Sequence, residues 1–292
     1  MYSFTCFGEV LWDVFPTHEK IGGAPLNVAF RLKSFNNKVS IISSVGNDIL
    51  GEKLIQYLDT NSIDTEHIQI SDDFETGKVN VNLDEGGSAT YQIQFPAAWD
   101  HIQPTREALA LVEKSHVFVY GSLASRNSVS KHTLLELLKV APFKVFDVNL
   151  RAPHFSQELL NELMTQADFI KFNEEELELI TKNLDSKTST IEKSMLFIAN
   201  TFNADYICVT KGGQGAVLLI RGKFYYNSGY RVSVKDTVGA GDSFLATLIY
   251  KLTSDVEPQV AIDNACAIGA LVAGSEGANP SILDTDVIDL LS

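Results

Sequence analysis

The segment VKDTVGAGDSF, residues 234–244, combines two glycines with a carboxylate where a helix is expected to begin. Gly239 and Gly241 form a Gly-x-Gly pair just before Asp242, and the apolar residues that follow have helical spacing. Unpaired backbone N–H groups converge at a helix N-terminus, so glycines there usually form an anion site. A carboxylate in the same place therefore needs its own explanation.

Phosphoryl transfer to an alcohol would use both parts of this segment. The glycine N–H groups would stabilise charge on the transferred group, while Asp242 would orient the attacking hydroxyl and accept its proton. The helix dipole should keep Asp242 ionised, which is the form that a base requires. The alternative role of Asp242 is a helix N-terminal carboxylate that only complements the dipole.

The elements that must position this segment are short apolar strands alternating with helices. Continuous apolar strands are buried on both faces, so the pattern predicts an α/β fold with a doubly wound, mostly parallel sheet flanked by helices. Ligands of such folds bind at the carboxyl ends of the strands, where residues 236–243 are expected to lie. The candidate strands are 4–11, 38–45, 115–121, 143–150, 168–172 and 205–210, and helices are expected around 134–140, 195–202 and 284–290.

Residues 77–95 have a different pattern, in which apolar and polar residues alternate on both sides of Gly86-Gly87. Period-two alternation around such a turn predicts a β-hairpin with one apolar face and one wet face. We interpret this hairpin as a lid over a cleft, and its apolar face favours a homodimer. A hairpin without either role is the alternative.

Composition excludes several classes of function. A net charge of −14 over 292 residues argues against a nucleic-acid partner, and no apolar run is long enough for a membrane span. The N-terminus lacks the features of a signal peptide, so we expect a cytoplasmic protein. The three cysteines have no paired spacing and are expected to be buried.

Two common nucleotide-binding motifs are missing from the sequence. The P-loop pattern G-x-x-x-x-G-K-[ST] does not occur, and Phe244 stands where a dinucleotide fingerprint needs a small residue after Gly239 and Gly241. These absences argue against a P-loop protein and against a dehydrogenase.

The segment DTVGAGDSF resembles the C-terminal signature of the ribokinase-like (PfkB) carbohydrate kinases, and GGAPLNVAFRL from Gly22 resembles their N-terminal glycine motif. DVNLR (147–151) and KFNEEE (171–176) follow in the family's order. Within the family, GEVLWDVFP, GGAPLNVA and AAWD are similar to segments of bacterial fructokinases, which phosphorylate the 6-hydroxyl of fructose with ATP and magnesium. The resemblance implies one kinase domain over residues 1–292, with a lid formed by about 10–21 and 76–100.

The resemblance also implies roles for individual residues in catalysis and in binding the acceptor. Asp242 would be the catalytic base, Gly239, Ala240 and Gly241 the backbone anion hole, and Arg151 the cation near the phosphates. The sugar-binding residues would be Asp13, Gly22, Gly23 and Asn27, and the aromatic residues Trp12, Phe95 and Trp99 could shape the choice of acceptor. Each sugar-binding residue has an ordinary alternative, such as a helix start after Gly22 and Gly23 or a solvated Asn27.

Further residues would hold ATP and cations. Asn173 and Glu176 match the family's N-x-x-E motif and would hold Mg²⁺ through water, although an acidic first turn of a helix explains them as well. The nucleotide would contact Asn173, Thr210, Gly212, Gly215 and Asn264, and a plain hairpin turn is the alternative for the glycines. Asp236 would belong to a monovalent-cation site, for which K⁺ is the candidate ion.

These observations predict an ATP-dependent sugar kinase that acts on fructose. A related kinase would act on ribose, 2-keto-3-deoxygluconate or a nucleoside instead. A regulatory protein that binds sugar without turnover is the rival from another class. The base Asp242 argues against that rival, because a pure binding protein does not need one.

Overall fold

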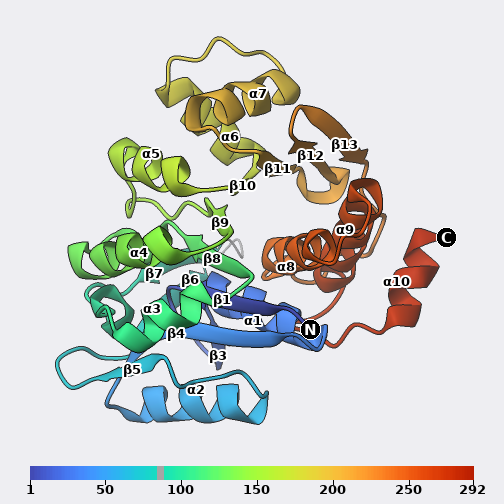
Figure 1. Ribbon diagram of the computed structural model, residues 1–292. Coiled ribbons are helices and arrows are strands. Elements are labelled where there is room, and N and C mark those ends of the chain that lie inside the picture. Colours follow the sequence, from blue (N-terminus) through green and yellow to red (C-terminus); the bar gives the residue numbers. More distant parts are fainter. Residues whose placement is uncertain (84–88) are drawn as a thin grey trace.

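The computed structural model describes residues 1–83 and 89–292, which form one large and one small β-sheet with helices on both faces of the large one (Figure 1). The turn expected at Gly86-Gly87 lies outside the described residues. In the part of the chain that is described, no helix is long and apolar enough to cross a membrane.

The large sheet has nine strands in the order β13-β12-β11-β10-β9-β8-β1-β4-β5. Neighbouring strands from β5 to β11 are parallel, and β12 and β13 are antiparallel additions at one edge. This topology confirms the predicted doubly wound α/β fold. The strands are β1 (Ser3–Phe7), β4 (Lys38–Gly46), β5 (Ile68–Ser71), β8 (Val117–Gly121), β9 (Lys144–Asp147), β10 (Phe169–Asn173), β11 (Tyr206–Thr210), β12 (Ala216–Ile220) and β13 (Lys223–Asn227).

Both faces of the large sheet are buried. Successive side chains of a strand point to opposite faces, so Phe118 and Val119 of β8 belong to two different hydrophobic cores. This explains the continuous apolar runs in the sequence. The helices are α1 (Ala24–Ser34), α2 (Ile49–Thr60), α3 (Arg106–Glu113), α4 (Ser128–Val140), α5 (Gln157–Gln166), α6 (Glu174–Asn183), α7 (Ile191–Phe202), α8 (Ala240–Thr253), α9 (Pro258–Ala273) and α10 (Asp284–Leu291), with short 3₁₀ turns at Ala98–His101, Leu123–Ser125 and Gly212–Gln214.

The small sheet contains the predicted hairpin. Its order is β3-β2-β6-β7, built from β2 (Leu11–Val14), β3 (Glu19–Gly22), β6 (Gly77–Leu83) and β7 (Ala89–Ile93). β6 and β7 are antiparallel, with Val79 opposite Ile93, which confirms the hairpin. β2 runs parallel to β6 and joins the hairpin to β3, so two segments far apart in sequence form one mixed sheet.

Candidate active site

The N-terminus of α8 is shaped by Gly239, which has a φ of 76°. A Cβ atom on Gly239 would lie 2.7 Å from the Cβ of Ala278, so only glycine allows this close approach. Among the described residues, no side chain caps α8. The Ala240 amide donates to the Thr237 carbonyl at 3.3 Å, whereas the amides of Gly241 and Asp242 remain available to a ligand. The geometry suits an anion hole at the start of α8, and within the predicted set of Gly239, Ala240 and Gly241 the Ala240 amide is already bonded.

Asp242 lies in this first turn and is joined to α1. The amide of Asn27 donates a hydrogen bond of 2.8 Å to Oδ2 of Asp242 and accepts one of 2.8 Å from the amide of Asn279. Asn27 is only 4% exposed, so the alternative of a solvated helix residue is wrong. Arg31 of α1 also donates to Ser243 Oγ at 3.2 Å, which fixes α1 against the start of α8.

The charge on Asp242 depends on its burial and on its neighbours. Burial and the negative charge of Asp147 raise the pKa of Asp242 from 3.8 to about 6, against the opposing effects of Lys171, Asn27 and Arg151. The contribution of the helix dipole to the charge of Asp242 stays a prediction. The charged form still predominates at pH 7, because the pKa remains below that value.

Sequence reasoning missed a buried ion pair beside this helix terminus. Lys171 Nζ donates to Asp147 Oδ1 at 2.9 Å, and both side chains are buried. The same Nζ lies 3.6 Å from the position of a Cβ atom on Gly241. Lys171 is therefore a second positive side chain near the glycines, in addition to the predicted Arg151. A lysine inside the apolar strand segment DFIKF was the available signal.

Arg151 follows β9 and is exposed. Its Nη1 donates to the carbonyl of Leu150 at 3.0 Å. The positive charge of Arg151 lowers the pKa values of Asp242, Glu9 and Asp13, although burial raises all three overall. The guanidinium thus lies within electrostatic reach of the predicted base and remains free to approach an anionic ligand.

Gly22 and Gly23 lie where a side chain would collide with neighbouring atoms. Gly22 lies opposite Leu11 in the β2–β3 pair, and a Cβ atom on Gly22 would overlap Oδ2 of Asp13. A Cβ atom on Gly23 would overlap the carbonyl oxygen of Glu9. Gly23 also precedes α1, which has a proline near its start, so the helix-start explanation holds alongside the proposed sugar contact. Burial raises the pKa of Asp13 to about 6.

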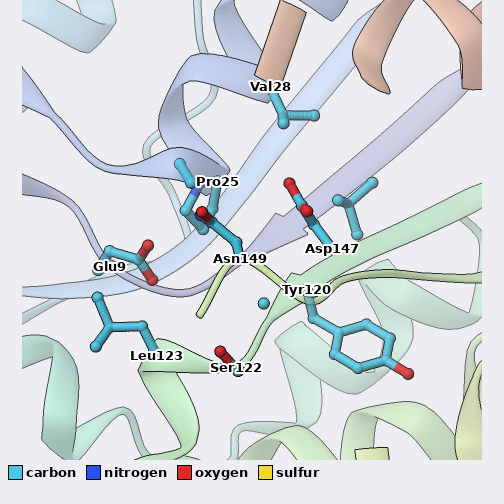
Figure 2. Close-up of a pocket in the computed structure, with 11 residues that line it drawn as sticks. Glu9, Pro25, Val28, Tyr120, Ser122, Leu123, Asp147 and Asn149 are labelled. Carbon is cyan, nitrogen blue, oxygen red and sulfur yellow. The ribbon is translucent and has the colours of Figure 1, made fainter. Parts of the chain in front are cut away.

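A small pocket lies below the start of α1, at the carboxyl ends of β8 and β9. Figure 2 shows Glu9 and Asp147 on opposite sides of Asn149, which faces Pro25. The pocket has a volume of about 10 Å³, enough for one water molecule. Within the described residues, Glu9 Oε2 and Asp147 Oδ2 are buried without a hydrogen-bond partner. Burial raises the pKa of Glu9 to about 7.

The aromatic candidates differ in how far the structure exposes them. Trp99 is fully buried in the main core, and the guanidinium carbon of Arg126 lies 4.0 Å from the centre of its ring. Trp99 has no surface for a sugar, so the prediction that it contacts the acceptor is wrong. Phe95 is 57% exposed and remains a candidate, while Trp12 Nε1 donates to the carbonyl of Leu50 at 3.1 Å.

Asn173 and Glu176 form a capping box at the start of α6. Asn173 Oδ1 accepts from the Glu176 amide at 2.8 Å, and Glu176 Oε2 accepts from the Asn173 amide at 2.8 Å. Glu176 Oε1 accepts from the Leu150 amide at 2.9 Å. The described residues contain no cluster of three or more acidic, histidine or cysteine side chains that could hold a metal directly. This donor set suits a Mg²⁺ ion bound mainly by phosphates and reached through water.

The predicted nucleotide loop is the turn of the β11–β12 hairpin. Thr210 pairs with Asn173 across β11 and β10, which places it beside α6, and its Oγ1 donates to the Phe172 carbonyl at 3.3 Å. Gly212 has a φ of 55° and open space around it, whereas a Cβ atom on Gly215 would overlap the carbonyl oxygen of Asn227. The hairpin explanation therefore accounts for these glycines, and contact with a nucleotide stays a prediction.

The two remaining candidates form hydrogen bonds with backbone groups. Asn264 Nδ2 donates to the Val260 carbonyl one turn earlier in α9, at 2.8 Å. Asp236 accepts from the amides of Val238 at 3.0 Å and Gly277 at 3.2 Å, which joins the loop before α8 to the loop after α9. A monovalent cation at Asp236 would need backbone carbonyls from these loops as additional ligands.

Comparisons with known proteins identify the family of this chain. The family model of the pfkB family carbohydrate kinases matches residues 2–286. The chain is 28% identical to probable fructokinase-3 of Arabidopsis thaliana over 315 residues, which covers 96% of this chain and 88% of that protein.

Solved structures share the fold over the whole chain. A fructokinase double mutant from Vibrio cholerae O395, in its form with fructose, ADP and potassium, is 27% identical, with a TM-score of 0.84 over 100% of this chain and 99% of that one. Aminoimidazole riboside kinase from Salmonella enterica has the same fold at 22% identity, with a TM-score of 0.83 over 99% of this chain and 100% of that one. The chain belongs to the pfkB family of carbohydrate kinases.

Proposed function

We propose that this carbohydrate kinase transfers the γ-phosphoryl group of ATP to the 6-hydroxyl of fructose, giving fructose 6-phosphate. The observation that carries the proposal is the placement of Asp242, a carboxylate with a raised pKa, in an uncapped first turn whose amides can bind an anion. Fructose is the acceptor named for relatives that match nearly the whole chain.

Different residues accept the proton, stabilise the transferred charge and bind the acceptor. Asn27 fixes Oδ2 of Asp242, so Oδ1 is left to accept the proton of the attacking hydroxyl. The first-turn amides of α8 and the guanidinium of Arg151 stabilise charge on the transferred group. Asp13, Gly22 and Gly23 orient the acceptor through hydrogen bonds. Mg²⁺ bound to ATP would neutralise charge on the phosphates, and Asn173 and Glu176 would reach its water ligands.

The small sheet is proposed to act as a lid. It joins β2, which carries Asp13, to the β6–β7 hairpin, so a movement of the sheet would move an acceptor ligand with it. Closure would exclude water, which otherwise competes with the sugar for the phosphoryl group. The same sheet is the surface through which we propose a homodimer.

ADP release with ATP and Mg²⁺ would test the acceptor. The panel contains fructose, ribose, glucose, mannose, 2-keto-3-deoxygluconate, adenosine and aminoimidazole riboside, and each reaction is repeated with Asp242→Asn. We expect release with fructose that disappears in the variant. Release with another acceptor alone would reject fructose and keep the chemistry. Silence with every acceptor would favour a binding protein without turnover.

A further inference from the structure

Lys171 is a buried cation that the proposed reaction has not used. It lies in β10 directly opposite Asp147 of β9, and its Nζ donates to Asp147 Oδ1 at 2.9 Å. Burial alone would lower the pKa of Lys171, but the charges of Asp147 and Glu176 raise it above its ordinary value. The ammonium therefore stays charged inside the protein.

The ammonium lies at the meeting point of three elements of the candidate site. Asp147 of β9 pairs with it directly, and the negative charges of Glu176 in α6 and Asp242 in α8 also raise the pKa of Lys171. Its Nζ is 3.6 Å from a Cβ position on Gly241, the residue that precedes Asp242. This places one fixed positive charge behind the turn that carries the base.

Without a neighbouring positive charge, Asp147 would favour the protonated form of Asp242. Its negative charge raises the pKa of Asp242, and its Oδ2 has no partner among the described residues. Two carboxylates that share a site cannot both stay charged easily, so one of them tends to take up a proton. A protonated Asp242 could not accept the proton of a sugar hydroxyl.

We propose that Lys171 is a positioning residue for phosphoryl transfer, whose buried ammonium offsets Asp147 and keeps Asp242 in its charged, proton-accepting form. The proposal rests on the proposed role of Asp242 as the base. Asp147 anchors the ammonium, and Lys171 in turn prevents Asp147 from suppressing the base. The pair thereby acts on the reaction without touching the acceptor.

The other charged groups around Asp242 are less suited to this task. Arg151 is exposed, so solvent screens its charge. Arg31 of α1 is directed to Ser243 and to the carbonyl of Pro280. Glu9 adds negative charge on the same side, and Asn27 is a neutral donor.

Titration of Asp242 by NMR tests the proposal without any acceptor. Protein labelled with ¹³C at the aspartate carboxyl carbons is titrated between pH 4 and pH 9, and the Asp242 signal is assigned by its loss in Asp242→Asn. We expect Lys171→Met to raise the midpoint by about one pH unit or more, and Asp147→Asn to lower it. Lys171→Arg keeps the charge and should leave the midpoint close to that of the unchanged protein.

An ion pair that only stabilises the fold gives a different result. It would lower the melting temperature in both charge-removing variants without moving the Asp242 midpoint. An unchanged midpoint in Lys171→Met, or shifts of the same sign in both variants, would overturn the proposal. If Lys171→Met does not fold, Lys171→Gln, which also removes the positive charge, takes its place and should raise the midpoint in the same way, while an unchanged midpoint in that variant would overturn the proposal.

Kinetics on the acceptor identified by the panel gives the functional readout. For Lys171→Met, kcat/KM should fall about tenfold at pH 6 and recover at pH 9, where Asp242 is charged in both proteins. A loss that is equal at both pH values contradicts the proposal. The NMR result does not depend on the acceptor, so rejection of fructose would leave this test intact.

Discussion

Asn27 donates a hydrogen bond of 2.8 Å to Asp242 across 215 positions of the chain. The bond joins the helix after the paired glycines to the helix that begins within the GAGD segment. Two motifs at opposite ends of the sequence thereby form one site. Asn27 also accepts from Asn279, so its amide orientation is fixed on both sides.

Replacing Asn27 should disturb the base more than the fold. Asn27→Ala removes the donor that lowers the pKa of Asp242, so this pKa should rise and turnover should fall about tenfold at pH 7. Asn37→Ala is a matched control, because Asn37 is an equally buried asparagine that bonds the Leu32 carbonyl at the other end of α1. Steady-state kinetics of both variants checks this, and equal losses would contradict a specific role.

The pH dependence of the reaction should reflect Asp242. Burial and Asp147 raise its pKa from 3.8 to about 6, so the base takes up a proton as the pH falls through 6. We expect kcat/KM to be constant above about pH 7 and to fall about tenfold per unit below pH 6. A pH series with a coupled ADP assay measures this. A profile that stays flat down to pH 5 would rule out a base with this pKa.

Gly239 should tolerate no side chain. In Gly239→Ala the new Cβ atom meets Ala278 at 2.7 Å and the backbone keeps a φ of 76°, so both crowding and strain act at the anion hole. Gly222→Ala is the control, because its φ of 84° is similar and its surroundings are open. Thermal melts should show a loss of about 1 kcal/mol for the control and a larger loss for Gly239→Ala. Turnover should fall only in Gly239→Ala, and normal turnover there would argue against the anion hole.

Asp13 should contribute to binding the acceptor and not to binding ATP. Asp13→Ala removes a partly buried carboxylate beside Gly22, so the dissociation constant for the sugar should rise about tenfold or more while that for ATP changes little. Asp205→Ala, which removes an exposed ion pair with Arg221, is the control. Separate calorimetric titrations of each ligand measure both constants. Equal weakening of sugar and ATP would contradict the assignment.

Local patterns were enough to predict much of this fold. Continuous apolar segments predicted the parallel sheet, because a strand that is buried on both faces has no alternation of apolar and polar residues. The segment that does alternate predicted the β6–β7 hairpin. Trp99 was misassigned because a tryptophan near a lid suits a sugar site and a core equally well. Its stacking under Arg126 is a tertiary contact that no local pattern encodes.

The electrostatics of the site depended on contacts distant in sequence. Lys171 and Asp147 stand 24 positions apart, and only the register of β9 and β10 brings them together. The pKa of Asp242 is raised by burial and by the charge of Asp147. Neither effect can be inferred from the residues of the GAGD segment. Local sequence therefore predicted the presence of a base but not the charges that tune it.

The most direct test of the account is turnover in Asp242→Asn together with its affinity for ATP. This variant keeps the size of the side chain and removes the proton acceptor, so turnover should fall at least about 10²-fold while the dissociation constant for ATP changes less than about threefold. Near-normal turnover would contradict the assignment of Asp242 as the base. A loss of ATP binding equal to the loss of turnover would show that Asp242 serves binding and not proton transfer.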